Sequence, residues 1–210
     1  MSPVGFYALL ATEGLLCSLK IRIIYTIWRK EQWSVRALWK DKTQYGISLI
    51  CILLIGLLYY TVGKELVVMQ FLDLLFSYLL LSAIDIRTHQ IPDSFLIYIG
   101  VSQLLYRLCV MPLEGLLWEL LTGVVVGVLL LILSILTKGS FGMGDAKLLG
   151  VTAVFTGVSY LIQIIFWGML CAFIYSIYLL ACKKVSRKTE LPFVPFLMGG
   201  MIVHMLVWVL

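Results

Sequence analysis

Long apolar runs separated by short polar connections dominate the chain. A helix that spans a membrane needs about 20 mostly apolar residues. On that criterion the sequence predicts eight segments, at residues 3–28, 45–63, 66–84, 94–112, 115–137, 145–160, 161–182 and 191–210. The first is the least regular, because it contains Glu13, Lys20 and Arg22. The pattern therefore predicts an all-α, polytopic transmembrane bundle with about eight spans (six to eight).

Composition supports a membrane protein. Of the 210 residues, 62% are hydrophobic and 13% are charged, whereas a soluble domain carries about 25% charged residues. The mean hydropathy is +1.05. Membrane lipid is an expected partner, and no nucleic-acid partner is predicted.

The basic residues predict the orientation. If the eight segments alternate, 12 of the 16 Lys and Arg residues lie on one side: Arg29, Lys30, Arg36, Lys40, Lys42, Arg87, Lys138, Lys147, Lys183, Lys184, Arg187 and Lys188. The positive-inside rule makes that side cytoplasmic. The expected location is a cytoplasmic (inner) membrane, with Asp85, Asp93 and Asp145 on the cytoplasmic face.

Two acidic motifs follow apolar runs. Asp85 ends the run from Phe71 to Ile84, and Asp145 follows Gly142-Met143-Gly144. Charged side chains at such positions usually face a cavity or a partner. Two carboxyl groups that meet titrate as a pair, with one protonated and one ionised, which suits acid–base activation of water on a peptide carbonyl. A helix N-terminus favours the ionised form, so Asp145 is the predicted base and Asp85 the predicted acid.

Neighbouring residues carry alternative interpretations. Gly142 and Gly144 allow close approach of an extended substrate chain, but Asp145 at the start of a helix from Ala146 is also a plain N-cap. Asp93 after Pro92 is read first as an N-cap of the segment from Ser94. Lys147 is a candidate for binding a lipid phosphate or a substrate acid. Asp73 is predicted to be structural, either pairing inside the bundle or reaching toward its surface.

Three blocks together resemble the type IV prepilin peptidases, a family of GxGD membrane aspartic proteases. They are Asp85 through Pro92-Asp93, the segment Gly142 to Leu148, and Leu191-Pro192-Phe193-Val194-Pro195-Phe196-Leu197. The resemblance covers about residues 66–210, the expected peptidase core, preceded by N-terminal membrane helices and a short basic loop in 1–65. It implies that Asp85 and Asp145 are the catalytic pair. It further implies that short basic leaders are cut from pilin-like precursors, with Gly142, Gly144, Lys147, Asp93, Pro92, Pro192 and Pro195 as supporting residues.

The front of the chain departs from that family. Many members carry paired CxxC motifs in a larger N-terminal cytoplasmic domain and also N-methylate the new pilin terminus. Here the loop at about 29–44 has no CxxC, so methyltransferase activity, with S-adenosylmethionine as cofactor, stays open. No metal or other cofactor is predicted. Two alternatives remain: a GxGD protease with another substrate, and a non-enzymatic transporter or assembly protein whose membrane acids carry protons.

Overall fold

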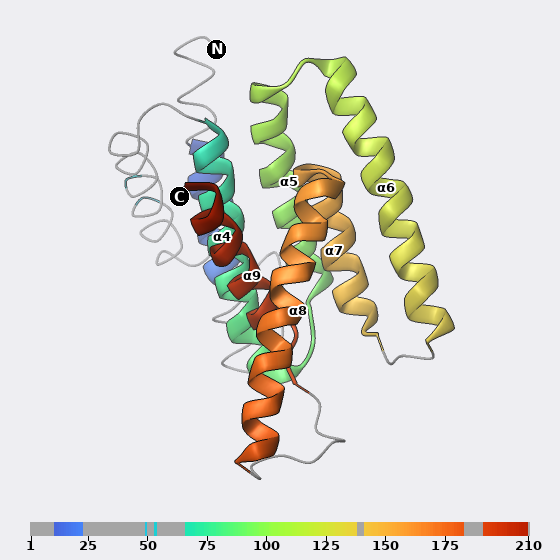
Figure 1. The fold of residues 1–210 in the computed structure, drawn as a ribbon. Helices are drawn as coiled ribbons and strands as arrows, with labels where there is room; N and C mark the ends of the chain where they lie inside the picture. The colour runs from blue at the N-terminus through green and yellow to red at the C-terminus, as the bar shows by residue number, and fades with distance from the viewer. Residues whose placement is uncertain are drawn as a thin grey trace. The chain divides into compact units, whose positions relative to one another are not determined.

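A computed structural model describes residues 11–22, 49, 53, 66–137, 141–182 and 191–209, and all regular structure in these ranges is helical (Figure 1). Residues 11–22 are helical. The helices that follow are α4 (Leu66–Thr88), α5 (Asp93–Val110), α6 (Leu113–Leu136), α7 (Met143–Thr156), α8 (Val158–Ala181) and α9 (Val194–Val209). The predicted segment at 45–63 lies almost wholly outside the described residues, and the basic connections at 29–44 and 183–188 lie entirely outside them.

Four helices in the described part of the chain are long and apolar enough to cross a membrane. They are Met69–Thr88, Asp93–Val110, Leu113–Leu136 and Val158–Ala181, and a shorter apolar helix covers Val194–Val207. Many large apolar side chains of α6 and α8 are exposed. Apolar surface of this extent is what a lipid environment covers, so the helical membrane class predicted from the sequence agrees with the fold.

The connection between α7 and α8 differs from the prediction. The sequence placed the boundary after residue 160, but the helices meet at Gly157, which has φ 84° and ψ 156°. A side chain at this positive φ would be strained, so glycine permits the break. The 14-residue α7 is consequently too short to be among the candidate spans.

The chain divides into two compact units. Unit 1 comprises Met1–Leu74 and Ile97–Leu116, and unit 2 comprises Leu75–Leu96 and Leu117–Leu210. In unit 1, the buried Lys20 ammonium group lies 2.8 Å from the Asp73 carboxylate. Asp73 therefore pairs inside its unit, which is one of the two arrangements predicted for it.

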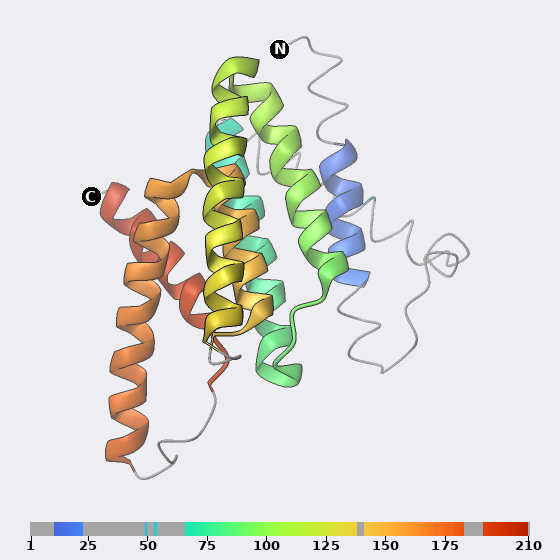
Figure 2. The same ribbon diagram turned by 90° about the vertical axis from the view of Figure 1, so that its right-hand side faces the viewer.

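Close backbone contacts hold the helices of unit 2. Helices α6 and α7 run side by side (Figure 2), and a Cβ added to Gly127 would lie 3.3 Å from the Gly150 Cα. Helices α8 and α9 approach similarly, since a Cβ on Gly200 would lie 2.6 Å from the Gly168 backbone nitrogen. Glycine is thus required at the crossing of α8 and α9, where a larger residue would separate the helices, and the contact between α6 and α7 at Gly127 is tight for any side chain.

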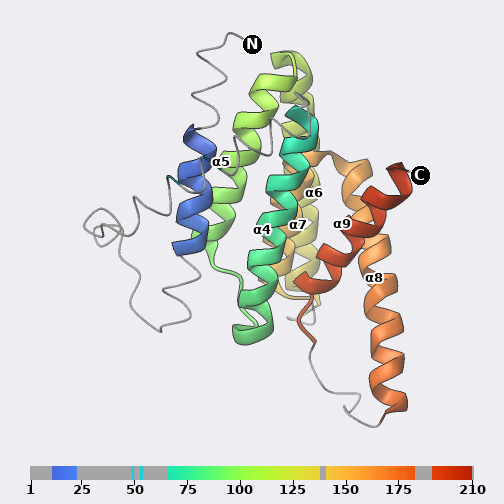
Figure 3. The ribbon, with the colours of Figure 1, turned by 90° about the vertical axis from the view of Figure 1, so that its left-hand side faces the viewer.

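The second half of α4 contacts both α7 and α9 within unit 2. The Tyr78 and Thr152 hydroxyl groups are hydrogen-bonded over 2.6 Å, and both residues are buried. The start of α9 lies beside the last turns of α4 (Figure 3), where the Ser82 hydroxyl is 3.9 Å from the Met198 sulfur. These contacts bring the ends of three helices to one place.

Candidate active site

Asp85 lies in the last turn of α4, as its position after an apolar run predicted. The helix ends at Thr88, and the next residue, His89, has a positive φ of 49°. The His89 N–H donates to the Asp85 carbonyl oxygen over 2.9 Å. This left-handed residue ends the helix, so the chain changes direction one turn after Asp85.

The start of α9 supplies a partner for the Asp85 side chain. The Val194 backbone N–H donates to Asp85 Oδ2 over 3.0 Å, and this contact is buried. Val194 is the first residue of α9, where backbone N–H groups lack helical acceptors. Pro195 follows it in the first turn, where its missing N–H leaves no bond unmade. The block around Pro192 and Pro195 therefore presents Val194 to Asp85.

Sequence reasoning missed this role of Val194. The block was recognised, but its prolines were assigned only a general supporting role. A proline within a first helical turn, directly after a polar connection, was the available signal for a helix N-terminus. Its hydrogen-bond partner, 109 residues earlier, could not be read from the sequence.

Asp145 lies at the start of α7, three residues beyond the N-cap. The helix begins at Met143, with Gly142 as N-cap and no side-chain cap, so the predictions of a start at Ala146 and of Asp145 as the cap are both wrong. A Cβ on Gly142 would lie 2.7 Å from Asp145 Oδ2. The absence of a side chain at residue 142 thus leaves the space that the Asp145 carboxyl group occupies.

Gly144 connects this motif to the loop after Asp85. A Cβ on Gly144 would lie 3.2 Å from the Ile91 Cβ. Such a contact is tight, so any side chain at residue 144 would push against the loop. A side chain at residue 142 would therefore collide with Asp145, and a side chain at residue 144 would press against Ile91.

Asp93 and Lys147 form an ion pair. Lys147 Nζ lies 2.7 Å from Asp93 Oδ1, and the side chains are 38% and 70% exposed. Asp93 is the first residue of α5, and the preceding Pro92 carbonyl accepts the N–H groups of Phe95 and Leu96. The expected N-cap role of Asp93 is therefore replaced by this pairing. The lipid or substrate contact predicted for Lys147 stays a prediction.

A cavity of about 380 Å³ joins the two acidic motifs within unit 2. It is lined by Asp85, Asp93, Gly142, Gly144, Asp145 and Lys147, together with His89, Gln90, Ile91 and Met143. Burial, and to a smaller extent the nearby charge of Asp85, raises the pKa of Asp145 to about 6. The two aspartates thus share a cavity and influence each other electrostatically. Pro192 and Pro195 do not line it.

The surroundings of the two carboxyl groups differ from those expected from their own helices. Asp85 accepts a backbone N–H, which stabilises a carboxylate. Asp145 is not the N-cap of α7, and burial together with the charge of Asp85 raises its pKa. The helix-dipole argument considered only each aspartate's own helix, whereas the hydrogen bond to Asp85 comes from α9.

A metal site requires several ligating side chains close together. Within the described ranges, no group of three or more His, Cys, Asp or Glu residues could hold a metal ion.

The sequence profile described as the type IV leader peptidase family matches residues 72–177, about half of the chain. That match contains Asp85, Asp93 and Asp145. No curated protein and no solved structure matches the chain.

Proposed function

Because the chain belongs to the type IV leader peptidase family, we propose that it is a membrane aspartic endopeptidase that removes leader peptides from pilin-like precursors. Asp85 and Asp145 are the proposed catalytic pair. The observation that carries this proposal is the single cavity lined by both carboxyl groups, in which Asp85 contributes to the raised pKa of Asp145. Two interacting carboxyl groups that differ in protonation provide the acid and the base of the reaction.

In the proposed reaction, Asp85 is the base and Asp145 is the acid. Asp85 takes a proton from a water molecule, the water oxygen bonds to the peptide carbonyl carbon, and Asp145 gives its proton to the carbonyl oxygen. The C–N bond of this tetrahedral intermediate then breaks. The proton on Asp85 passes to the leaving nitrogen, and a hydroxyl proton of the intermediate returns to Asp145, which restores both groups.

The motif around Gly142 is the proposed place for the substrate backbone. An extended peptide can pair with an exposed backbone segment through main-chain hydrogen bonds. Gly142 has an extended conformation, with φ −60° and ψ 133°, directly before α7. A precursor lying along this segment has its scissile bond beside Asp145. The positive-inside distribution of Lys and Arg supports a cytoplasmic position for this site.

The test is processing of a co-expressed pilin-like precursor, read by intact mass. Wild type, Asp85→Asn, Asp145→Asn and Glu114→Gln are compared at equal membrane abundance. Glu114 is the matched control because it is an exposed acid in the first turn of α6. We expect leader loss with wild type and Glu114→Gln only. The same spectrum shows whether the new terminus carries a methyl group, which answers the open question of methyltransferase activity.

Leader loss with either Asn variant at the wild-type level contradicts the catalytic assignment. If folded wild type processes none of several pilin-like precursors, the substrate assignment is wrong. Cleavage of another membrane-anchored precursor would then support a GxGD protease with a different substrate.

A further inference from the structure

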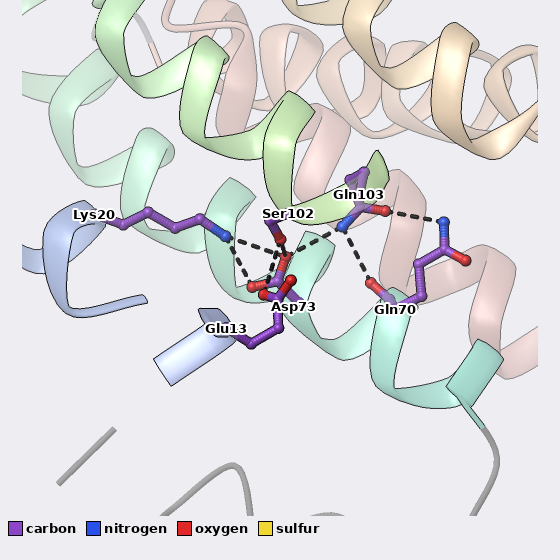
Figure 4. A network of polar contacts seen from close by, with 6 residues as sticks. All are labelled: Glu13, Lys20, Gln70, Asp73, Ser102 and Gln103. Atoms are coloured by element: carbon purple, nitrogen blue, oxygen red, sulfur yellow. Dashed lines mark hydrogen bonds and ion pairs between the residues drawn. The ribbon is translucent and has the colours of Figure 1, made fainter. Parts of the chain in front are cut away.

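Three helices of unit 1 bring two acids and one lysine together in a buried network (Figure 4). Glu13 and Lys20 come from residues 11–22, Asp73 from α4, and Ser102 and Gln103 from α5. Glu13 is 1% exposed, Lys20 is 0% exposed, and the Asp73 side chain is 9% exposed. The peptidase reaction proposed above uses none of these groups.

Asp73 has the contacts of an ionised carboxylate. Lys20 Nζ donates to Asp73 Oδ1 over 2.8 Å and to Oδ2 over 3.1 Å. Gln103 Nε2 donates to Asp73 Oδ2 over 3.1 Å, and the Ser102 hydroxyl makes a short hydrogen bond to the same oxygen. Gln103 is held in turn by Gln70, whose Nε2 lies 3.1 Å from Gln103 Oε1. Charged and neutral donors thus converge on Asp73.

Glu13 is in a different situation. Its Oε2 lies 3.1 Å from the Ser102 Oγ, whereas its Oε1 is buried with no hydrogen-bond partner among the described residues. A buried carboxylate oxygen without a donor is far less stable than the carbonyl oxygen of a neutral acid in the same place. The contacts of Glu13 therefore suit a carboxylic acid.

Counting hydrogens at Ser102 leads to the same result. A serine hydroxyl has one hydrogen and can accept through its oxygen. Ser102 faces two carboxyl oxygens, Glu13 Oε2 and Asp73 Oδ2. Since one hydroxyl hydrogen cannot serve both oxygens, a Ser102 that donates to Asp73 can bond Glu13 only by accepting a hydrogen from it. In that arrangement a protonated Glu13 would donate to Ser102, and Ser102 would donate to an ionised Asp73.

The charges of the network also require a proton. Two ionised carboxylates beside one ammonium group would leave a net negative charge in an apolar surrounding, which is strongly unfavourable. The charged groups that act on Glu13 are Asp73 and Lys20. Tyr106 also faces this network, because the charges of Glu13 and Asp73 both act on its hydroxyl group. One proton on Glu13 makes the network neutral.

We propose that Glu13, with Ser102, Asp73 and Lys20, forms a proton-binding site in unit 1, separate from the peptidase pair. The bound proton sits on the Glu13 carboxyl group and links residues 11–22 to α5 through Ser102. Glu13 is thereby a neutral hydrogen-bond donor, while the pair of Lys20 and Asp73 holds the charges. This site goes beyond the proposed peptidase function and does not depend on it.

Infrared spectroscopy of the full chain in lipid at neutral pH tests this site. The difference spectrum of wild type minus Glu13→Gln should contain the C=O stretch of a protonated carboxyl group, and labelling with carbon-13 glutamate should shift that band. Glu114→Gln is the control, because this exposed acid should instead remove carboxylate bands. If Glu13→Gln removes only carboxylate bands, Glu13 is ionised and the proposal is overturned.

Glu13→Gln also has an expected stability. Gln keeps the size, the neutrality and the ability to donate to Ser102, so we expect an unchanged Tm and unchanged precursor processing. A Glu13→Gln protein that fails to fold contradicts the proposal, because a neutral donor would then not be sufficient at this position. If the protonated-carboxyl band is absent but wild type still processes the precursor, the proton-binding site is wrong and the proposed peptidase function is unaffected.

Discussion

The Tyr78 hydroxyl of α4 and the Thr152 hydroxyl of α7 are hydrogen-bonded to each other. Each of these two residues is separated from the aspartate of its own helix by the same number of residues. Asp85 follows Tyr78 by seven residues in α4, and Asp145 precedes Thr152 by seven residues in α7. Seven residues are about two helical turns, so each aspartate lies on nearly the same helix face as its hydroxyl partner. The bond thus fixes how α4 and α7, which run antiparallel, are aligned along their axes. In this alignment Asp85 and Asp145 line the same cavity.

Removing this bond should reduce catalysis more than it reduces stability. We expect Tyr78→Phe and Thr152→Val each to lower kcat at least tenfold with little change in KM, because small misplacements of catalytic groups cost up to about 100-fold in rate. The loss of stability should be about 1 kcal/mol for Tyr78→Phe, the net value of one hydrogen bond, and about 1–3 kcal/mol for Thr152→Val, which removes the acceptor of the buried Tyr78 hydroxyl. Steady-state cleavage of a precursor peptide and thermal unfolding of the purified proteins provide both measurements.

Thr122→Val is the matched control for this pair. The Thr122 hydroxyl is exposed and donates only within α6, to the carbonyl oxygens of Trp118 and Glu119. Its removal should leave kcat unchanged. Equal effects of Thr122→Val and Thr152→Val would mean that the bond between α4 and α7 has no positioning role.

Gly142→Ala should inactivate the enzyme without unfolding it. The new Cβ would lie 2.7 Å from Asp145 Oδ2, so the carboxyl group must move. We expect a loss of about 100-fold or more in kcat/KM and a nearly unchanged Tm. Gly115→Ala is the control, since its Cβ would meet nothing nearer than 3.8 Å. Wild-type activity in Gly142→Ala would show that Asp145 does not need its observed position.

The pH dependence of cleavage should show the raised pKa of Asp145. Burial, together with Asp85, raises this pKa to about 6. The protonated form needed for donation to the carbonyl oxygen is lost as the pH rises through that value. We therefore expect kcat/KM of the wild type to fall above pH ~6, approaching tenfold per pH unit. A rate that is constant or rising from about pH 6 to about pH 8 would exclude Asp145 as the acid.

Two adjacent glycines of α9 should differ in their tolerance of alanine. A Cβ on Gly200 would lie 2.5 Å from the Ile164 carbonyl oxygen, whereas one on Gly199 would meet only the Cys171 sulfur at 3.9 Å. Gly200→Ala should lower Tm markedly, by the equivalent of about 1–3 kcal/mol of overpacking. Gly199→Ala should have little effect. Similar unfolding temperatures for both variants would contradict the close crossing of α8 and α9.

Much of this arrangement could be predicted from the sequence because long apolar runs carry a strong signal. The runs predicted α4, α5, α6 and α9 to within a few residues, and the acidic motifs predicted the two candidate catalytic residues. The boundary between α7 and α8 was missed because both sides are apolar. Only the backbone conformation of Gly157 distinguishes them.

Contacts between distant segments could not be predicted in the same way. The proposed division of roles between the aspartates rests on the Val194 N–H, which belongs to a helix that starts 109 residues after Asp85. The pairing of Asp93 with Lys147 likewise needs two motifs to be brought together. A single sequence reports the local dipole and burial of each acid, but not the donors that the fold supplies.

Cleavage by the purified single and double aspartate variants tests most directly whether Asp85 and Asp145 act as a pair. Groups that act as one unit are strongly non-additive when removed together. We expect Asp85→Asn and Asp145→Asn each to slow cleavage of a precursor peptide by at least about 1,000-fold, with the double variant no slower than either single variant. A single variant within about tenfold of wild type, or a double variant slower by the product of the two losses, would contradict a shared catalytic site.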